Sequence, residues 1–385
     1  MLGRRGLRLG LAAAVAVLSA FFAAEAARAG STTISDGNDK PGLLDIRSAS
    51  HGHSGATKVT HTIRTFGNWP IGLLGPSTPN FFSLEISTDG DRAPERIVLI
   101  FSSSGKMVAG VATANQTLVG LASATRPNGH TVRVVIRRAL LGDPAGYRWQ
   151  ALSFYQASGG CGRGCLDKAP NRTRQVPHDL RAPTISFPQP GVPANTSYNV
   201  GFSVSDSGGS GVKSWHLQRR PAGATTWATV RSGTSGGSKQ YNHVGAQGQD
   251  SQFRIVAIDR HGNRSTSPVR TVSVPIDDAS FTYTGTWSTG GSPGVDFLGT
   301  LHASSTASDA ATVMVGGAFV ALIAPGGAGV AEIRIDGVLE GTVDLSTFSG
   351  PRRVVFQKSL GSATSRAVEV RVVSGTFQVD GIIDR

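Results

Sequence analysis

The sequence predicts an all-β protein of tandem β-sandwich modules that follow an N-terminal signal peptide. The 385 residues include 50 Gly and 19 Pro, which favour many short strands joined by tight turns. Several segments alternate apolar and polar residues with period two, whereas none holds a convincing helical period of 3.6 residues. A chain of this length exceeds what one β-sandwich requires, so we expect two or three folded domains.

The N-terminus has the three parts of an export signal. Arg4, Arg5 and Arg8 form a positive region, residues 9–22 are apolar, and Ala27-Arg28-Ala29 has the small-x-small pattern of a cleavage site. We therefore expect residues 1–29 to be removed and the protein to be secreted or displayed on the cell surface. Sec and twin-arginine export both remain open. No other apolar run approaches 18 residues, so no membrane span is expected after signal removal.

The formal net charge of +12 limits the classes of binding partner that we expect. A basic protein can bind nucleic acid or another anionic polymer. The sequence has no run of five basic residues and no aromatic-basic motif of a nucleic-acid module, so we expect no nucleic-acid partner. Scattered solvated charge is the favoured explanation, and attachment to the cell wall through basic charge is an alternative.

Residues 30–181 are predicted to form an N-terminal β domain. Gly, Pro and Asn128-Gly129 separate its strand candidates, which are residues 59–66, 81–86, 97–101, 108–112, 131–136 and 147–154. Two stretches, from Asp36 to Ile46 and from Trp149 through Cys161, Cys165 and Asp167 to His178, resemble an uncharacterised domain of exported actinobacterial proteins. That resemblance implies no known activity. The polar, Pro-containing residues 172–184 are interpreted as a linker.

Residues 182–275 are predicted to form a second module. Residues 198–204, 215–219 and 253–259 are strand candidates, Trp215 is the best core candidate, and His261-Gly262-Asn263 supplies turn chemistry. The spacing of Asp206, Gly211-Val212, Trp227, Ala257-x-Asp259, Gly262-Asn263 and Ser265 resembles bacterial immunoglobulin-like and fibronectin type III modules. The resemblance implies a spacer or binder. Ser251 stands where that family usually has its corner tyrosine.

Residues 276–385 are predicted to form a third module. Residues 366–373 alternate almost perfectly, and Asp336-Gly337 between two strand candidates indicates a hairpin. These features, with Tyr283, Trp287, Val343-Asp344-Leu345 and Val379-Asp380-Gly381, resemble galactose-binding-like jelly-roll modules, which implies sugar binding. The ligand-binding candidates are Asp277, Asp278, Tyr283 and Trp287. The alternative is that Tyr283 and Trp287 are core residues, because they face the same way on a strand.

Cysteines and histidines give further candidates. Cys161 and Cys165, the two cysteines, are expected to form one disulfide in an exported chain. His51 and His53 with His61 from a neighbouring strand could bind zinc. However, residues 51–55 look turn-like, and surface histidines are the favoured alternative.

Acidic residues at short spacing follow the predicted cleavage site. Asp36, Asn38, Asp39 and Asp45 are oxygen ligands of the kind calcium takes, but the twelve-residue calcium loop with its terminal Glu is absent. A role in capping turns is favoured instead.

The function we expect is a secreted or cell-surface binding and display protein that recognises carbohydrate or cell-wall polymer. The middle module is expected to be a spacer and the third module the ligand binder. The alternatives are an extracellular hydrolase with its site in the N-terminal domain and a purely structural spacer. We assign no catalytic residue and no cofactor, favour a non-enzymatic role, and expect a monomer.

Overall fold

A computed structural model of the chain describes residues 32–53, 57–157, 161–171, 176–207 and 209–385. The predicted signal peptide lies outside these residues. The chain divides into two compact units. The first comprises the chain up to Thr184 together with Ser205–Ser214 and Ala257–Ser265, and the second comprises Ile185–Val204, Trp215–Val256 and Thr266–Arg385.

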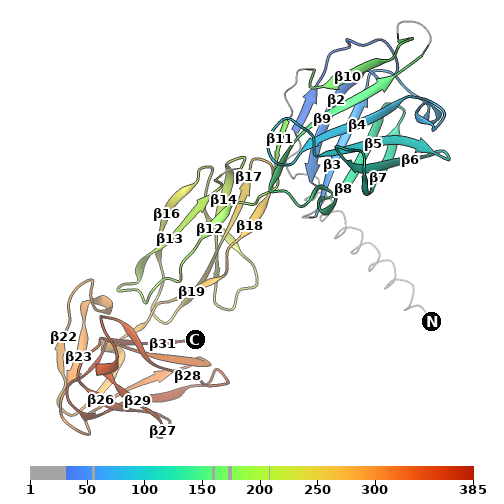
Figure 1. The fold of residues 1–385 in the computed structure, drawn as a ribbon. Helices are drawn as coiled ribbons and strands as arrows, with labels where there is room; N and C mark the ends of the chain where they lie inside the picture. Colours follow the sequence, from blue (N-terminus) through green and yellow to red (C-terminus); the bar gives the residue numbers. More distant parts are fainter. Residues whose placement is uncertain (1–31, 54–56, 158–160, 172–175, 208) are drawn as a thin grey trace, which may run out of the picture. The chain divides into compact units, whose positions relative to one another are not determined.

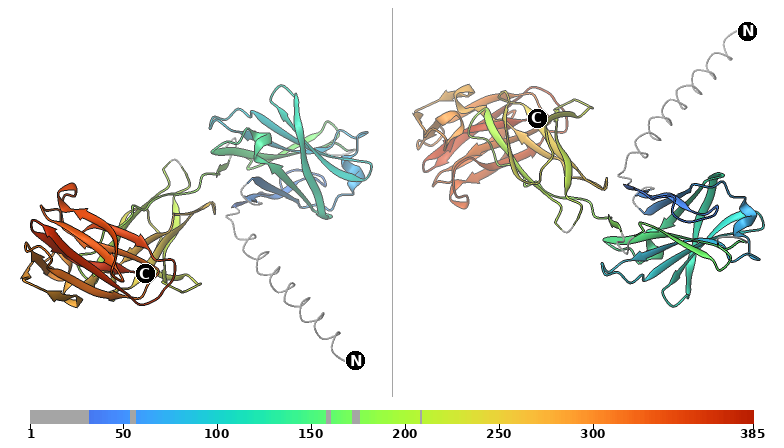
Figure 2. Two further views of the ribbon diagram at one scale, coloured as in Figure 1. Left: turned by 90° about the horizontal axis from the view of Figure 1, so that it is seen from below. Right: turned by 90° about the horizontal axis from the view of Figure 1, so that it is seen from above.

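The N-terminal domain is one curled antiparallel sheet of eleven strands (Figures 1 and 2). Its strand order is β1-β2-β3-β8-β7-β6-β5-β4-β9-β10, and β11 pairs with the far end of β9. The strands are β1 Thr32–Ser35, β2 Ile46–His53, β3 Lys58–Thr65, β4 Phe81–Ser87, β5 Arg96–Ser103, β6 Lys106–Thr113, β7 Leu118–Asn128, β8 Thr131–Arg137, β9 Gly146–Tyr155, β10 Cys165–Ala169 and β11 Val176–Asp179.

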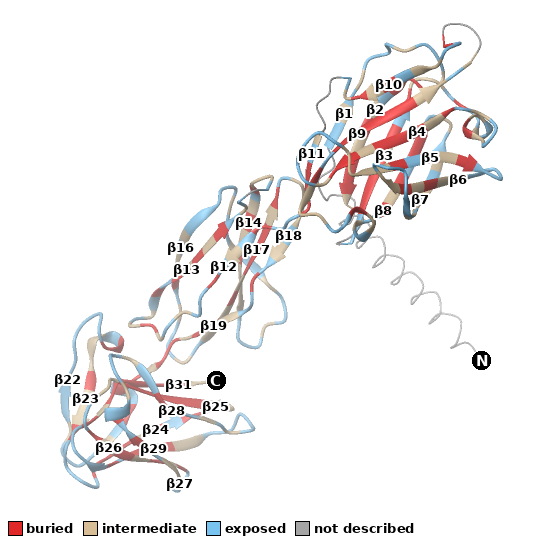
Figure 3. Ribbon diagram, viewed as in Figure 1, coloured by how far each residue is buried: buried red, intermediate tan, exposed pale blue. Residues whose placement is uncertain are grey.

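The core of this domain lies on the inner face of the curled sheet. Buried positions alternate along most of β8, whereas β3, β4 and β9 contain runs of three to five consecutive buried residues. Figure 3 shows the buried segments in red. The largest fully buried side chains there are Trp69, Phe82 and Trp149. Because the sheet curls, β2 and β9 face each other: the indole N–H of Trp149 donates to Nδ1 of His51.

Five of the six strand candidates of this domain fall within observed strands, and the sixth, residues 59–66, extends one residue past the end of β3 at Thr65. Two other expectations were wrong. Residues 51–53 belong to β2 and are not a turn, because Gly52 pairs with Thr60 in the ladder between β2 and β3. The predicted linker contains β11, where Pro177 stands opposite Arg148, and Leu180 is buried in the core. In both cases long-range pairing overrides the local turn chemistry.

Residues 184–273 form two antiparallel sheets, ordered β12-β13-β16 and β15-β14-β17-β18, with β19 also paired to β17. Trp215 is 3 % exposed, its ring meets that of Phe202 edge to face, and its indole N–H donates to the carbonyl of Ser235. The strands are β12 Thr184–Ser186, β13 Ser197–Ser205, β14 Val212–Pro221, β15 Ala228–Gly233, β16 Gly237–Val244, β17 Asp250–Asp259, β18 Arg264–Thr266 and β19 Arg270–Ser273.

Residues 276–385, which correspond to the predicted third module, contain three sheets, ordered β20-β31-β25-β28, β21-β24-β29-β26-β27 and β22-β23-β30. The strands are β20 Ile276–Asp277, β21 Thr282–Thr284, β22 Ser288–Gly290, β23 Leu301–Ser304, β24 Ala310–Val315, β25 Phe319–Ala324, β26 Val330–Ile335, β27 Val338–Asp344, β28 Arg353–Ser359, β29 Arg366–Ser374, β30 Phe377–Val379 and β31 Gly381–Asp384. Asp336 and Gly337 both have positive φ, 50° and 80°, and join β26 to β27 in the hairpin that the sequence predicts.

The described helices are five short 3-10 turns: η1 Ile71–Leu74, η2 Arg138–Leu141, η3 Asp278–Ser280, η4 Phe297–Gly299 and η5 Leu345–Thr347. In the part of the chain that the structure covers, no helix has both the length and the apolar character needed to cross a bilayer. The expected all-β fold class is therefore confirmed.

Replacement of Trp215 tests the core of the middle module. Trp215→Ala should lower the free energy of unfolding by about 3–5 kcal/mol, because it removes a large buried side chain and leaves a cavity. The matched control is Trp227→Ala, since Trp227 is half-buried between the guanidinium groups of Arg220 and Arg254. Urea unfolding of the mature chain measures both. Equal losses for the two variants would contradict a core role for Trp215.

Candidate functional site

Buried histidines meet where β2, β3 and β11 approach the turn after β17. His51 and His61 are directly paired across β2 and β3, and His178 stands on β11. His51, His61 and His178 are each 1 % exposed. His261 lies in the turn that Asp259 and Gly262 form after β17. One ring nitrogen from each of His51, His178 and His261 lies within 4.8 Å of the others.

The rings pack on one another and on two aromatic residues of β9. The centroid of His178 is 3.9 Å from that of His51 and 4.8 Å from that of His53. His61 lies against Trp149, and its Nε2 is 2.8 Å from the hydroxyl of Tyr147. Both ring nitrogens of His178 and Nε2 of His51 are buried without a hydrogen-bond partner. The cluster is therefore a polar core whose hydrogen-bonding capacity is largely unused.

Burial favours the neutral form of His51, His53, His61 and His178. Desolvation lowers the pKa of His51 to about 3, with a further contribution from His261. Burial also lowers the pKa of His61, His178 and His53, and the neighbouring histidines add to the effect in each case. Neutral imidazoles are the form that can ligate a metal or accept a proton.

The structure places His178 and His261 beside the predicted zinc ligand His51, and it also restricts the tautomer of His51. His178 and His261 were not among the candidates. Their ring nitrogens lie within 4.8 Å of each other and of a ring nitrogen of His51, in a group that does not include His53 or His61. Nδ1 of His51 accepts the indole N–H of Trp149, which places the proton of neutral His51 on Nε2. Zinc binding through Nε2 would have to displace that proton, and a zinc site at His51, His53 and His61 stays a prediction.

A cavity of about 370 Å³ opens beside the cluster, within the first unit. It is lined by His178, His261 and Tyr147, with Arg148, Asp179 and Arg181 at its polar side. The cavity therefore combines the neutral imidazole of His178 with acidic and basic side chains, and a polar ligand could bind there.

In the third module, three of the four predicted ligand-binding residues contact one another or a shared histidine. Tyr283 stacks on His302 at 4.1 Å between centroids and lies 5.1 Å from Trp287. Asp278, which is fully buried, accepts hydrogen bonds from Nδ1 of His302 and from the hydroxyl of Thr300. We refer to Tyr283, Trp287 and His302 as the aromatic group.

The aromatic group is half-buried, and a hydrogen bond and core contacts hold it in place. The hydroxyl of Tyr283 donates to the carbonyl of Asp278 over 2.8 Å, and Tyr283 and Trp287 also pack against the core. Burial and the adjacent Asp278 raise the pKa of Asp277 to about 6. The carboxylate of Asp278 therefore positions His302 and Thr300, and the half-buried rings keep part of their surface available to a ligand.

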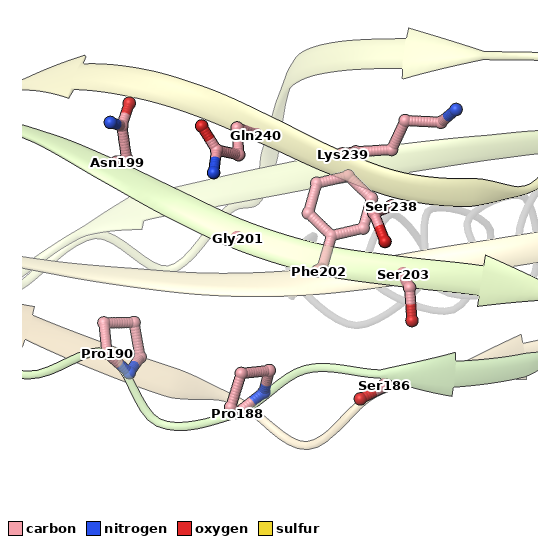
Figure 4. Close-up of a pocket in the computed structure, with 10 residues that line it drawn as sticks. All are labelled: Ser186, Pro188, Pro190, Asn199, Gly201, Phe202, Ser203, Ser238, Lys239 and Gln240. Atoms are coloured by element: carbon pink, nitrogen blue, oxygen red, sulfur yellow. The ribbon is translucent and has the colours of Figure 1, made fainter.

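A third place is the groove of about 350 Å³ on the middle module, between β13, β16 and the segment that follows β12 (Figure 4). The rings of Pro188 and Pro190 lie opposite the amides of Asn199 and Gln240. Lys239 is the one ionisable residue of its lining, so the groove can bind a neutral polar chain but carries no acid-base pair.

Comparison with known proteins leaves the family open. No family model matches the chain, and no curated protein matches it. Solved structures that resemble it include an adhesin with which an Antarctic bacterium binds ice, described as Ca²⁺-stabilised (13 % identity, 86 % of this chain, 69 % of that one, TM-score 0.24). Another is the protein SGBP-B of Bacteroides ovatus in complex with a mixed-linkage heptasaccharide (10 % identity, 91 % and 98 %, TM-score 0.21). A third is the two-domain fragment DIP-gamma IG1+IG2 (12 % identity, 57 % and 90 %, TM-score 0.21). At these TM-scores the similarities carry no argument about function.

Acidification tests whether the histidine cluster is buried in the neutral form. A histidine whose pKa is lowered by folding contributes full stability above its unfolded pKa of about 6.5 and loses it as the pH falls towards the folded value. His178 faces four other histidines and Tyr147. Its buried neutral form should therefore lower the free energy of unfolding by about 1.4 kcal/mol for each pH unit below about pH 6. His178→Phe should reduce the loss of stability between about pH 7 and about pH 4.5.

The control is His130→Phe, because His130 is exposed and lies outside the cluster. Urea unfolding midpoints at the two pH values measure the effect. An unchanged pH dependence in His178→Phe would show that His178 is protonated or solvated in the folded protein.

Proposed function

We propose that this protein is a secreted or cell-surface binding and display protein whose third module recognises carbohydrate or cell-wall polymer. The observation that carries the proposal is the aromatic group, in which Tyr283, Trp287 and His302 are held together over the buried carboxylate of Asp278. Sugar rings pack on aromatic faces, and a ring fixed by hydrogen bonds loses little entropy when a ligand binds.

The surroundings of the aromatic group support a polar ligand. Five exposed residues with hydroxyl side chains lie close to Trp287 in the sequence: Thr282, Thr284 and Thr286 before it, and Ser288 and Thr289 after it. Hydroxyl groups both donate and accept hydrogen bonds, as a polysaccharide requires. The site is shallow, so we expect weak binding that repetition along a polymer would strengthen.

The groove of the middle module supports the same kind of ligand. Its amides and hydroxyls are uncharged apart from Lys239, and they face two proline rings. We propose it as a secondary contact for a polymer chain, although the sequence indicates only a spacer there.

An extracellular hydrolase is the second candidate function, and the cavity beside His178 and His261 favours it. Both ring nitrogens of His178 are unpartnered and could hydrogen-bond a substrate or water in this cavity, while its lowered pKa makes it a weak general base. Incubating the mature chain with each polymer it binds, and measuring the chain length of the polymer afterwards, separates the two functions. Shortened products, lost in His178→Phe, would favour the hydrolase.

Binding should depend on Trp287. Mature protein should be retained by at least one member of a panel of galactans, arabinans and peptidoglycan fragments in affinity electrophoresis and calorimetry. Trp287→Ala should weaken that binding roughly tenfold or more, because stacking on an aromatic ring is lost. Trp227→Ala is the matched control, since Trp227 is a half-buried tryptophan of another module.

Three outcomes would contradict this proposal. Absence of binding to every polymer by a folded protein would leave a structural spacer. Binding that Trp287→Ala does not weaken would place the ligand elsewhere, with the middle-module groove as the next candidate. Binding that disappears at high salt would indicate attachment through basic charge rather than sugar recognition.

A further inference from the structure

Four carboxylates lie close together in the N-terminal domain, and none of them belongs to the histidine cluster. Asp36, Asp39 and Asp45 lie on the loop between β1 and β2, and Asp167 lies on β10. One oxygen from each of Asp39, Asp45 and Asp167 lies within 4.8 Å of the others. The side-chain amide of Asn171, just after β10, donates to Asp36 over 2.7 Å and to Asp39 over 2.9 Å.

Two oxygens of this group have no partner although they are buried. Asp45 is 3 % exposed, and its Oδ2 makes no hydrogen bond. Oδ2 of Asp36 is likewise buried and unpartnered. Leaving a buried carboxylate oxygen unsatisfied is costly, so each such atom calls for a ligand.

Among the residues that the structure describes, the group forms no ion pair. Asp167 is 2 % exposed, and its two oxygens accept the backbone N–H groups of Ile46 and Lys168. Lys40 is the nearby cation, and burial together with Asp167 nevertheless raises the pKa of both Asp36 and Asp45 to about 6.

We propose that these four aspartates bind a calcium ion that fastens the β1–β2 loop to β10. Calcium takes six to eight oxygen ligands at about 2.3–2.6 Å, so two ligands on opposite sides of the ion lie about 4.8 Å apart. The separations among Asp39, Asp45 and Asp167 fit that limit, and Asp36 is linked to Asp39 through the side-chain amide of Asn171. Magnesium binds at about 2.0–2.1 Å in a strict octahedron and would require the oxygens to move closer. The group offers no nitrogen or sulfur ligand, which disfavours zinc and copper.

The rest of the loop is built to hold this arrangement. Gly42 has φ of +117° and lies so close to the ring of Tyr155 that an added Cβ would be 2.3 Å from a ring carbon. The Sγ of Cys161, bonded to Cys165, lies 2.9 Å from the carbonyl oxygen of Pro41. The loop between Asp39 and Asp45 is therefore fixed by packing, so that a bound ion meets a preformed site.

A second acidic group in the same domain provides the control. Asp89, Asp91 and Glu95 are also close enough to share an ion, but Asp89 and Asp91 are exposed. Their oxygens accept hydrogen bonds from neighbouring backbone groups in the loop after β4. They show no buried, unpartnered oxygen among the described atoms, so we expect no specific binding there.

Calorimetric titration and thermal unfolding of the EDTA-treated mature chain test the proposal, with CaCl₂ as the probe. We expect one calcium ion to bind and the unfolding temperature to rise with calcium concentration. Asp45→Asn should abolish binding, and Asp39→Asn should weaken it roughly tenfold or more. Asp39 is exposed and outside the core, so this variant should fold even if Asp45→Asn does not. MgCl₂ should bind at least roughly tenfold more weakly.

Asp91→Asn, in the second acidic group, should bind calcium as the unsubstituted chain does. The proposal is overturned by absence of calcium binding in the unsubstituted chain, by unchanged binding in Asp39→Asn, or by loss of binding in Asp91→Asn. None of these outcomes depends on whether the third module binds carbohydrate.

Discussion

The N-terminal domain depends on a buried hydrogen bond between residues 121 apart in the sequence. Oδ2 of Asp167 on β10 accepts the backbone N–H of Ile46, the first residue of β2, over 2.6 Å. This bond joins β10, at one end of the strand order, to β2, which is next to the strand at the other end. The hydrogen bond from Trp149 on β9 to His51 on β2 links the same two regions of the sheet. The histidine cluster and the aspartate group therefore both depend on the same closure of the sheet.

The two clusters solve the problem of buried polar groups in opposite ways. The histidines give up charge, because burial makes the neutral imidazole the stable form and neutral rings can pack against Trp149 and Tyr147. Four aspartates on one corner have no such simple solution, because at neutral pH a carboxylate without a partner pays a large desolvation cost. A neutral polar core and a charged corner in one domain indicate that only the corner needs a counterion.

Much of the fold could be predicted from local patterns, and the exceptions have a common cause. Asp336-Gly337 favours the positive φ angles that a two-residue hairpin turn needs, so the dipeptide alone predicts the hairpin. Trp215 could be placed in a core because it stands in an alternating strand. By contrast, Gly52 and Pro177 give turn signals locally, yet both lie in strands whose partners are far away in the sequence.

The sites were less predictable than the fold. Asp45 and Asp167 each lie in a stretch that resembles the uncharacterised exported domain. Their spacing in the sequence does not predict that they are close in space, because the curled sheet brings them together. His178 and His261 gave no signal in the sequence, since each is a single histidine in a turn-rich segment. His302 was also missed, although it holds Tyr283 and Asp278 in one group.

The disulfide Cys161–Cys165 and the aspartate group lie on either side of the same short loop, at Pro41 and at Asp39 and Asp45. A disulfide persists in oxidising surroundings, and millimolar calcium is typical of the space outside a cell. If the chain is exported and binds calcium as proposed, neither the disulfide nor the ion would be present in the cytosol, and repulsion among the aspartates would oppose closure of the loop. An exported chain of this kind would thus stay loose enough for translocation and become rigid only after it has crossed the membrane.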